Sequence, residues 1–149
     1  MPMTISTKGR YAIRALIEIA LNQDKGLVLV KDVSVSQAIS EKYLERIFSS
    51  LKSAGFVKSR RGCKGGYILA RKPEEINILD VLKALEGSLA PVECVETPSC
   101  TRLKACAARL LWIKLNSAIE RTLGAATLAV LVDEQRRLSS EKQPLMFQI

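Results

Sequence analysis

Histidine is absent from this chain of 149 residues, and aromatic side chains are scarce, with three Phe, three Tyr and one Trp. Without an imidazole there is no histidine triad, no histidine general base and no histidine zinc ligand. A phosphate-binding glycine loop and a cluster of acidic residues are missing too, so we expect neither an enzyme nor a small-molecule substrate. The scarcity of aromatics argues against a surface that stacks the bases of RNA.

Long apolar segments are missing as well. No run approaches the roughly 20 apolar residues of a membrane span, and the amino-terminal residues lack the basic and apolar segments of a signal peptide. We therefore expect a cytoplasmic protein with no membrane partner. In a reducing compartment the four cysteines would not form a disulfide framework.

What is present is a globular composition with an uneven charge. Hydrophobic residues make up 48% of the chain and charged residues 26%. Residues 1–75 hold fourteen Lys and Arg against seven Asp and Glu, whereas residues 76–149 hold nine against eight. This asymmetry predicts a polyanion-binding domain at 1–75 and a second unit at 76–149. A well-solvated basic surface is the alternative.

The basic half predicts three helices. Apolar spacing places the first at about 8–22, with Ser6 or Thr7 as its cap. The apolar run 27–30 is either a small strand or the approach to a second helix at 31–38. Ser40 then caps a third helix that ends at Ser53. Its apolar stripe consists of Leu44, Ile47, Phe48 and Leu51.

A hairpin follows, with strands predicted at 56–59 and 67–70. Three glycines in the loop between them permit a tight reversal, and three cations give its tip a positive charge. In the second half we expect a helix at 78–86, a loop at 88–101 and a long helix at 103–123. A last helix should run from a Thr127 cap to about residue 137, followed by a frayed polar tail.

This order of elements predicts a mostly α (α+β) fold, a winged helix-turn-helix with its helix-turn-helix at about 30–53 and its wing at 56–70. A single helix fits the major groove of duplex DNA, and a guanidinium at a wing tip suits the minor groove. The alternative is an ordinary amphipathic helix followed by a flexible hairpin. The predicted DNA-binding residues are Ser40, Lys42, Tyr43, Glu45, Arg46, Ser49, Arg60, Arg61, Lys64, Gly65 and Gly66.

The second constellation is formed by Cys94, Cys100 and Cys106. On a continuous helix, thiols six residues apart would point about 240° away from one another, so the segment must form a loop if the sulfurs converge. Zinc usually takes four ligands with closer spacing. Iron–sulfur clusters tolerate other spacings and mixed ligands. Three small buried residues without a metal are the alternative.

Three stretches carry a resemblance to a known family: residues 6–12 (STKGRYA), 39–45 (ISEKYLE) and 61–71 (RGCKGGYILAR). Together with the cysteine triad they resemble the Rrf-two family of bacterial transcription regulators, whose best-known members are iron–sulfur sensors. The resemblance covers about residues 3–133. It implies a homodimer formed through the helix at 103–123 and bound to a partly palindromic operator. It also implies that Lys42, Glu45 and Arg46 read the major groove, that Arg61 enters the minor groove, and that the three cysteines hold a two-iron or four-iron cluster.

The chain departs from the family pattern at two positions. Some members place a histidine three residues after the third cysteine, where this chain has Arg109, and the wing carries Cys63. A guanidinium cannot ligate iron, so the fourth ligand is open, with Glu86 or Glu93 as candidates and Glu96, water or a small thiol as others. We expect a repressor controlled by an iron–sulfur cluster. The alternative is the same fold with a metal-free thiol switch or a protein effector.

Overall fold

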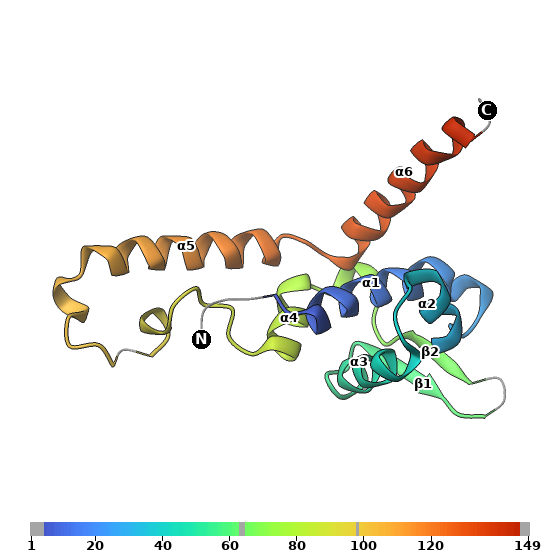
Figure 1. Ribbon diagram of the computed structural model, residues 1–149, viewed down its shortest axis with the longest axis horizontal. Helices are drawn as coiled ribbons and strands as arrows, with labels where there is room; N and C mark the ends of the chain where they lie inside the picture. Colours follow the sequence, from blue (N-terminus) through green and yellow to red (C-terminus); the bar gives the residue numbers. More distant parts are fainter. Residues whose placement is uncertain (1–4, 63–64, 98, 147–149) are drawn as a thin grey trace.

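The computed structural model describes residues 5–62, 65–97 and 99–146, with side chains as far as residue 141. Its order is α1 (Thr7–Asn22), α2 (Val30–Gln37), α3 (Glu41–Ser53), β1 (Val57–Arg60), β2 (Gly66–Leu69), α4 (Ile78–Glu86), α5 (Ala107–Gly124) and α6 (Leu128–Met146). Short 3-10 turns lie at Gln23–Lys25, Pro73–Glu75, Glu93–Val95 and Leu103–Ala105. Figure 1 shows α1 to α4 and the hairpin as one body, from which α5 and α6 extend in different directions.

The main core lies between α1, α3 and the hairpin. Its largest buried side chains include Leu16 and Ile19 of α1 and Leu44, Ile47 and Phe48 of α3. The ring of Phe48 stacks on that of Tyr67 in β2, with ring centroids 4.5 Å apart. This stacking contact joins the hairpin to α3, so the wing and the third helix share one core.

The caps predicted from the sequence are confirmed. The Ser6 hydroxyl accepts a hydrogen bond from the amide of Gly9, and the Ser40 hydroxyl accepts one from the amide of Tyr43. Thr127 caps α6 in the same way, through the amide of Val130. Each cap satisfies one of the free amides at a helix start.

The first four helices and the strands lie within one residue of their predicted bounds. The apolar run 27–30 combines both predicted alternatives, because Val28 forms an antiparallel bridge with Tyr67 and α2 begins two residues later. The strands pair Val57 with Leu69 and Arg60 with Gly66. The hairpin loop is therefore shorter than predicted, since Arg60 and Gly66 belong to the strands.

Two predicted bounds are wrong. The long helix begins at Ala107 rather than at residue 103, because Cys106 has an extended backbone and separates it from the 3-10 turn before it. The last helix does not end near residue 137 but continues to Met146. Arg137 explains part of this extension, since its guanidinium contacts Glu134 and Glu141 one turn away on each side. Both acids raise the pKa of Arg137 above its ordinary value.

The α5–α6 corner is fastened to the start of α4. The side-chain amide of Asn77 donates to the carbonyl of Gly124 at 2.6 Å. The amide of Ile78 donates to the carbonyl of Ala126, and the amide of Leu128 donates to that of Ile76. Beyond the corner, Leu128 and Val132 of α6 enter the main core. The direction of α5 is thus set by hydrogen bonds to the α4 segment.

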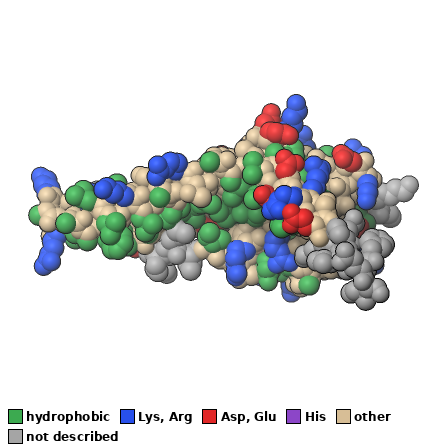
Figure 2. All heavy atoms as spheres, turned by 90° about the horizontal axis from the view of Figure 1, so that it is seen from above, with side chains coloured by type: hydrophobic (Ala, Val, Ile, Leu, Met, Phe, Trp, Pro, Cys, Tyr) green, Lys and Arg blue, Asp and Glu red, His purple; other side chains and the backbone are tan. Residues whose placement is uncertain are grey.

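Helix α5 is an arm with no buried residue. Leu110, Leu111 and Leu115 are 62%, 58% and 42% exposed, and Figure 2 shows hydrophobic side chains at the surface along this arm. Exposed apolar surfaces of this kind are typical of interaction sites. Within the described ranges, no helix combines the length and the hydrophobicity that crossing a bilayer requires.

Candidate nucleic-acid interface and cysteine loop

Helix α3 presents a polar face opposite its buried stripe. Lys42, Glu45, Arg46 and Ser49 are all exposed, as is the cap residue Ser40. Their spacing places them on one side of the helix, because residues three and four apart share a face. The apolar stripe anchors α3 in the core, so these polar groups are held in a fixed array at the surface.

The turn between α2 and α3 is held by side chains from α1 and α2. Ala38 has a left-handed backbone, with φ 54° and ψ 45°. Arg14 of α1 donates to both the side chain and the carbonyl of Gln37, at 2.9 and 2.7 Å. The Ser34 hydroxyl donates to the carbonyl of Ile39 at 2.6 Å. These contacts fix the angle at which α3 leaves the turn.

Tyr43 differs from the other predicted DNA-binding residues of α3 because it is half-buried. Its ring meets the ring of Tyr11 edge to face, with centroids 5.8 Å apart. The guanidinium of Arg14 lies 5.2 Å from the centroid of the Tyr11 ring. Tyr43 therefore has a packing role as well as a place at the edge of the polar face.

In the wing, Arg60 and Arg61 are exposed. Lys64, also predicted to bind DNA, lies outside the described residues, as does Cys63. Gly65 and Gly66 have a steric role. A Cβ on Gly65 would lie 2.9 Å from the carbonyl oxygen of Gly62, and one on Gly66 would lie 2.7 Å from that of Val28. The backbone approach that joins the wing to Val28 thus requires glycine at position 66.

Within the described part of the chain, Lys42, Arg46, Arg60 and Arg61 form no ion pair with a carboxylate. Their charges are therefore not neutralised internally. Cations in this state are available to phosphates, whose contacts dominate the affinity of DNA-binding proteins. The α3 face and the wing together form what we call the α3–wing face.

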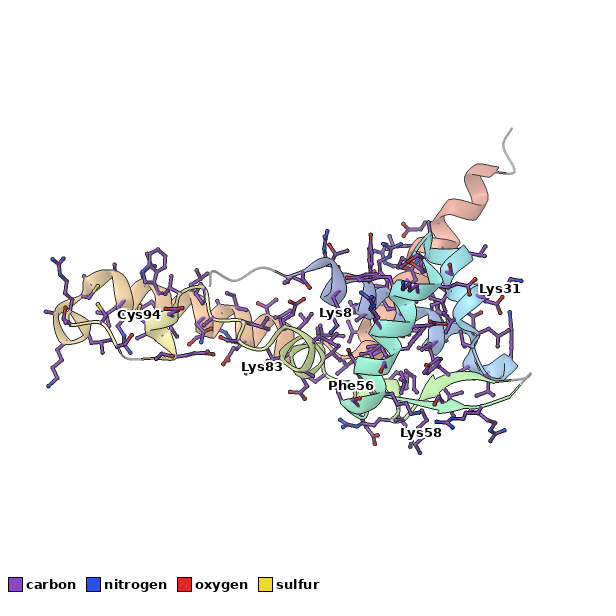
Figure 3. The ribbon with its side chains drawn as sticks, turned by 60° about the horizontal axis from the view of Figure 1, so that its bottom comes forward. Lys8, Lys31, Phe56, Lys58, Lys83 and Cys94 are labelled. Atoms are coloured by element: carbon purple, nitrogen blue, oxygen red, sulfur yellow. The ribbon has the colours of Figure 1, made fainter. Side chains whose placement is uncertain are left out.

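The cysteine loop, described at residues 88–97 and 99–106, leads from the end of α4 alongside the α5 arm to its far end (Figure 1). All three of its cysteines are free thiols, with Cys94 and Cys106 half-buried and Cys100 exposed. The guanidinium of Arg109 in the first turn of α5 donates to the carbonyl of Cys94 at 3.1 Å. Figure 3 shows Cys94 on the segment that runs beside α5. The loop is thus folded back on the helix by Arg109.

The structure places the three thiols on one loop but does not bring them to one point. Among the described residues, no three Cys, Asp or Glu side chains are grouped closely enough to hold a metal ion. The chemistry of the donor set still suits iron, because thiolates are the usual ligands of iron–sulfur clusters. The residue types fit such a cluster, and the loop would have to draw the thiols together around it.

Glu86, one candidate for the fourth ligand, is already engaged elsewhere. Its carboxylate accepts hydrogen bonds from the amide and the hydroxyl of Ser6, at 3.0 and 2.6 Å. A Cβ on Gly9 would contact the same carboxylate. This junction of α4 with the start of α1 was not predicted, because its partners are 80 positions apart and no local pattern joins them. Glu93, the other candidate, lies in the 3-10 turn that also contains Cys94.

The helix-turn-helix followed by a two-stranded wing defines a winged helix-turn-helix protein. A family profile described as "Rrf2: Iron-dependent Transcriptional regulator" matches residues 5–134, and the chain belongs to this family of transcriptional regulators rather than to a family of enzymes. The predicted resemblance and fold class are thereby confirmed.

Relatives and solved structures agree with this assignment. The chain is 42% identical to Protein rrf2 of Nitratidesulfovibrio vulgaris over 131 residues, which cover 87% of each chain. It is 37% identical to the regulator CymR of Bacillus subtilis over 147 residues, 99% of this chain and all of CymR. The structure of that CymR, described as the global cysteine regulator, matches with a TM-score of 0.77 over 89% of this chain and 98% of CymR. The structure of IscR from T. potens matches with a TM-score of 0.72 and 35% identity over 89% of this chain and 88% of IscR.

Proposed function

We propose that this protein is a dimeric regulator that binds a partly palindromic DNA operator through the α3–wing face. The observation that carries the proposal is a set of exposed cations on α3, at the end of β1 and just after it, which form no ion pair among the residues that the structure describes and lie beside the polar groups of α3. In this arrangement Ser40, Lys42, Glu45, Arg46 and Ser49 face the major groove, and Arg61 enters the minor groove.

The proposed dimer forms through α5. Leu110, Leu111 and Leu115 are exposed on a helix that has no fully buried residue, and an exposed apolar surface of this kind is suited to a partner surface. A second copy supplies the same apolar face, as expected of a two-fold symmetric contact. Two copies also supply the two DNA-binding bodies that a partly palindromic operator requires.

We further propose that an iron–sulfur cluster held by Cys94, Cys100 and Cys106 controls operator binding. The three free thiols on one loop support this proposal, as does the description of the family as iron-dependent. When bound, the cluster would supply a group that changes with iron or redox state. The fourth ligand stays open between Glu93, Glu86 and an exogenous donor.

The chain itself offers two connections between the cysteine loop and the DNA-binding body. Arg109 ties Cys94 to α5, and Glu86, two residues before the loop, ties α4 to the cap of α1. A change in the conformation of the cysteine loop would therefore be transmitted to α5 through Arg109 and to the start of α1 through Glu86. Coupling of about 1–3 kcal/mol between the loop and the DNA face would change operator occupancy about 5–150-fold.

The experiment is anaerobic reconstitution with iron and sulfide, followed by selection of operators from random duplexes with and without the cluster. We expect a visible chromophore, a palindromic consensus, and an affinity that differs between the two forms. Cys100→Ala should lose the chromophore, whereas Cys63→Ala should keep it. Equal DNA affinity with and without the cluster would overturn the control mechanism but not the DNA-binding assignment.

A metal-free thiol switch is the second candidate. The described structure does not gather three ligands, Cys100 is exposed, and the chain is similar to a protein described as the global cysteine regulator. In this version two thiols would form a disulfide and pass two electrons and two protons to an oxidant such as peroxide. Purified protein without iron would then lose or gain operator affinity on oxidation and recover it with dithiothreitol.

A further inference from the structure

A groove of about 600 Å³ lies where the end of α3 meets the base of the wing. It is lined by the three cations Lys52, Lys58 and Arg71 together with Gly55, Val57, Ser59 and Ala70. No acidic residue lines it within the described part of the chain. We call this surface the basic groove. Lys58 belongs to the wing cations that the sequence already makes candidates for neutralising phosphates, whereas Lys52 and Arg71 are not among the DNA-binding residues predicted from the sequence.

The three cations of the basic groove are available to an anion. All three are exposed, and none forms an ion pair within the described residues. The guanidinium of Arg71 lies 5.2 Å from the centroid of the Phe56 ring, so the ring positions it while leaving its N–H donors unused. A guanidinium held in this way loses little conformational freedom when it binds a phosphate.

The basic groove continues the α3–wing face. Glu45, Ser49 and Lys52 follow one another at helical spacing, so Lys52 extends the polar face of α3. Lys58 and Arg60 are the two exposed residues of β1. In Figure 3 Lys58 projects outward from β1 near Phe56. The groove and the polar face are therefore parts of one cationic surface.

The length of α3 indicates which part of a DNA duplex would lie against the basic groove. The major groove is about 12 Å wide, and the seven steps from Lys42 to Ser49 span about 10 Å of helix. If these residues lie in the major groove, Lys52 stands about 5 Å further along the axis, at the sugar-phosphate wall. Lys58 and Arg71 flank the same place.

We propose that the basic groove binds a backbone phosphate of duplex DNA that borders the half-site read by α3. The proposal rests on the proposed DNA-binding function and adds a sequence-independent contact to it. Phosphate contacts position a protein on DNA without reading its sequence. The groove would therefore raise affinity for every duplex and require DNA that extends beyond the recognised bases.

The test compares wild-type protein with the triple variant Lys52→Gln, Lys58→Gln, Arg71→Gln, in which glutamine keeps most of the side-chain length. Each is titrated against the selected operator, the operator with four added base pairs on each side, a random duplex of that length and a polyglutamate peptide, across a salt series. The control is Lys83→Gln, Arg136→Gln, Arg137→Gln, which removes the same charge from exposed residues of α4 and α6, outside the α3–wing face, the cysteine loop and α5. Circular dichroism verifies folding, and the single variants replace the triple variant if it is unfolded.

We expect the groove variant to bind both long duplexes about tenfold or more weakly, with a salt slope smaller by about 0.9 for each phosphate that the protein no longer neutralises. The control should behave like the wild type. Unchanged affinity and slope on both long duplexes would overturn the phosphate contact, and so would a loss confined to polyglutamate peptide, which would assign the groove to an acidic protein partner. Failure of the wild type to bind any duplex would overturn the proposed function itself.

Discussion

Ala38 is the residue at which the helix-turn-helix has its least favourable backbone. It is the one non-glycine residue with positive φ in the described ranges, and a left-handed backbone costs such a residue about 1–2 kcal/mol. Glycine would remove this strain, but it loses more backbone entropy on folding than alanine does, which costs about 0.5–1 kcal/mol of stability. We expect Ala38→Gly to raise the free energy of unfolding by about 0.5–1 kcal/mol, measured by urea denaturation.

The matched control for this substitution is Ala54→Gly at the end of α3, where the backbone is right-handed, with φ −80°. There glycine relieves no strain, so the same change should lower stability. Equal effects at positions 38 and 54 would show that the left-handed turn stores no strain.

Glu86 can also be tested as a single residue. Its carboxylate accepts two hydrogen bonds from Ser6, and hydrogen bonds to charged groups contribute about 1.5–3 kcal/mol. We expect Glu86→Ala to lower the free energy of unfolding of the metal-free protein by about 2 kcal/mol. Glu120→Ala, which removes an exposed ion pair with Lys83, should cost less than about 1 kcal/mol.

Metal-free Glu86→Ala protein with wild-type stability would contradict this structural role. If the same variant also failed to take up a cluster, Glu86 would be a ligand instead. The sequence made Glu86 a candidate because it is an acid close to the cysteine loop. Its contact with Ser6 is a tertiary one that only the folded chain reveals.

At the scale of elements, the wing offers a comparison between two cations. Arg61 is exposed immediately after β1, and its planar guanidinium suits the narrow minor groove. We expect Arg61→Ala to weaken operator binding by about 1–3 kcal/mol and to reduce specificity. Lys64→Ala should weaken operator and random duplexes alike and lower the salt slope by about one. Titrations on both duplexes measure the difference. Equal losses on both duplexes for Arg61→Ala would remove its groove-reading role.

The elements also show how far the sequence could predict the fold. Helices with a cap and an apolar stripe, such as α3, were predicted within one residue because both signals are local. The start of α5 was misplaced because residues 103–106 have no helix-breaking side chain, and only the extended backbone at Cys106 ends the preceding turn. The length of α6 was underestimated because its last turns have polar residues, which are stabilised by contacts along the helix rather than by a core.

The candidate site divides in the same way. The polar face of α3 follows from periodicity, and the structure places its residues together as predicted. The sequence makes Lys58 a candidate for a phosphate contact, but it does not predict the basic groove, because Lys52, Lys58 and Arg71 come from separate segments and no spacing pattern joins them. The cysteines were found by their spacing, but spacing cannot show how far a loop of this length must move to bring three thiols together.

At the scale of the whole molecule, the proposed dimerisation through α5 can be tested directly. Leu111 and Leu115 are exposed on α5, so a charge at either position should not disturb the monomer. We expect Leu111→Glu with Leu115→Glu to convert a dimer to a folded monomer, seen by sedimentation and circular dichroism. The monomer should still bind a half-site but lose its preference for the full palindrome. Val35→Glu, on the 78% exposed residue of α2, should leave the dimer intact. A double variant that stayed dimeric would place the interface elsewhere.

Asn77 holds α5 at its last residue, Gly124, so a small rotation at this end would be amplified along the helix. The helix has 18 residues and is about 27 Å long, so a rotation of about 5° at the corner would move its far end by about 2 Å. In a dimer joined through α5, the same rotation would change the distance between the two α3 helices. If α3 reads the operator as proposed, the operator spacing that the protein accepts would be governed by a few hydrogen bonds at a corner outside both the α3–wing face and the cysteine loop.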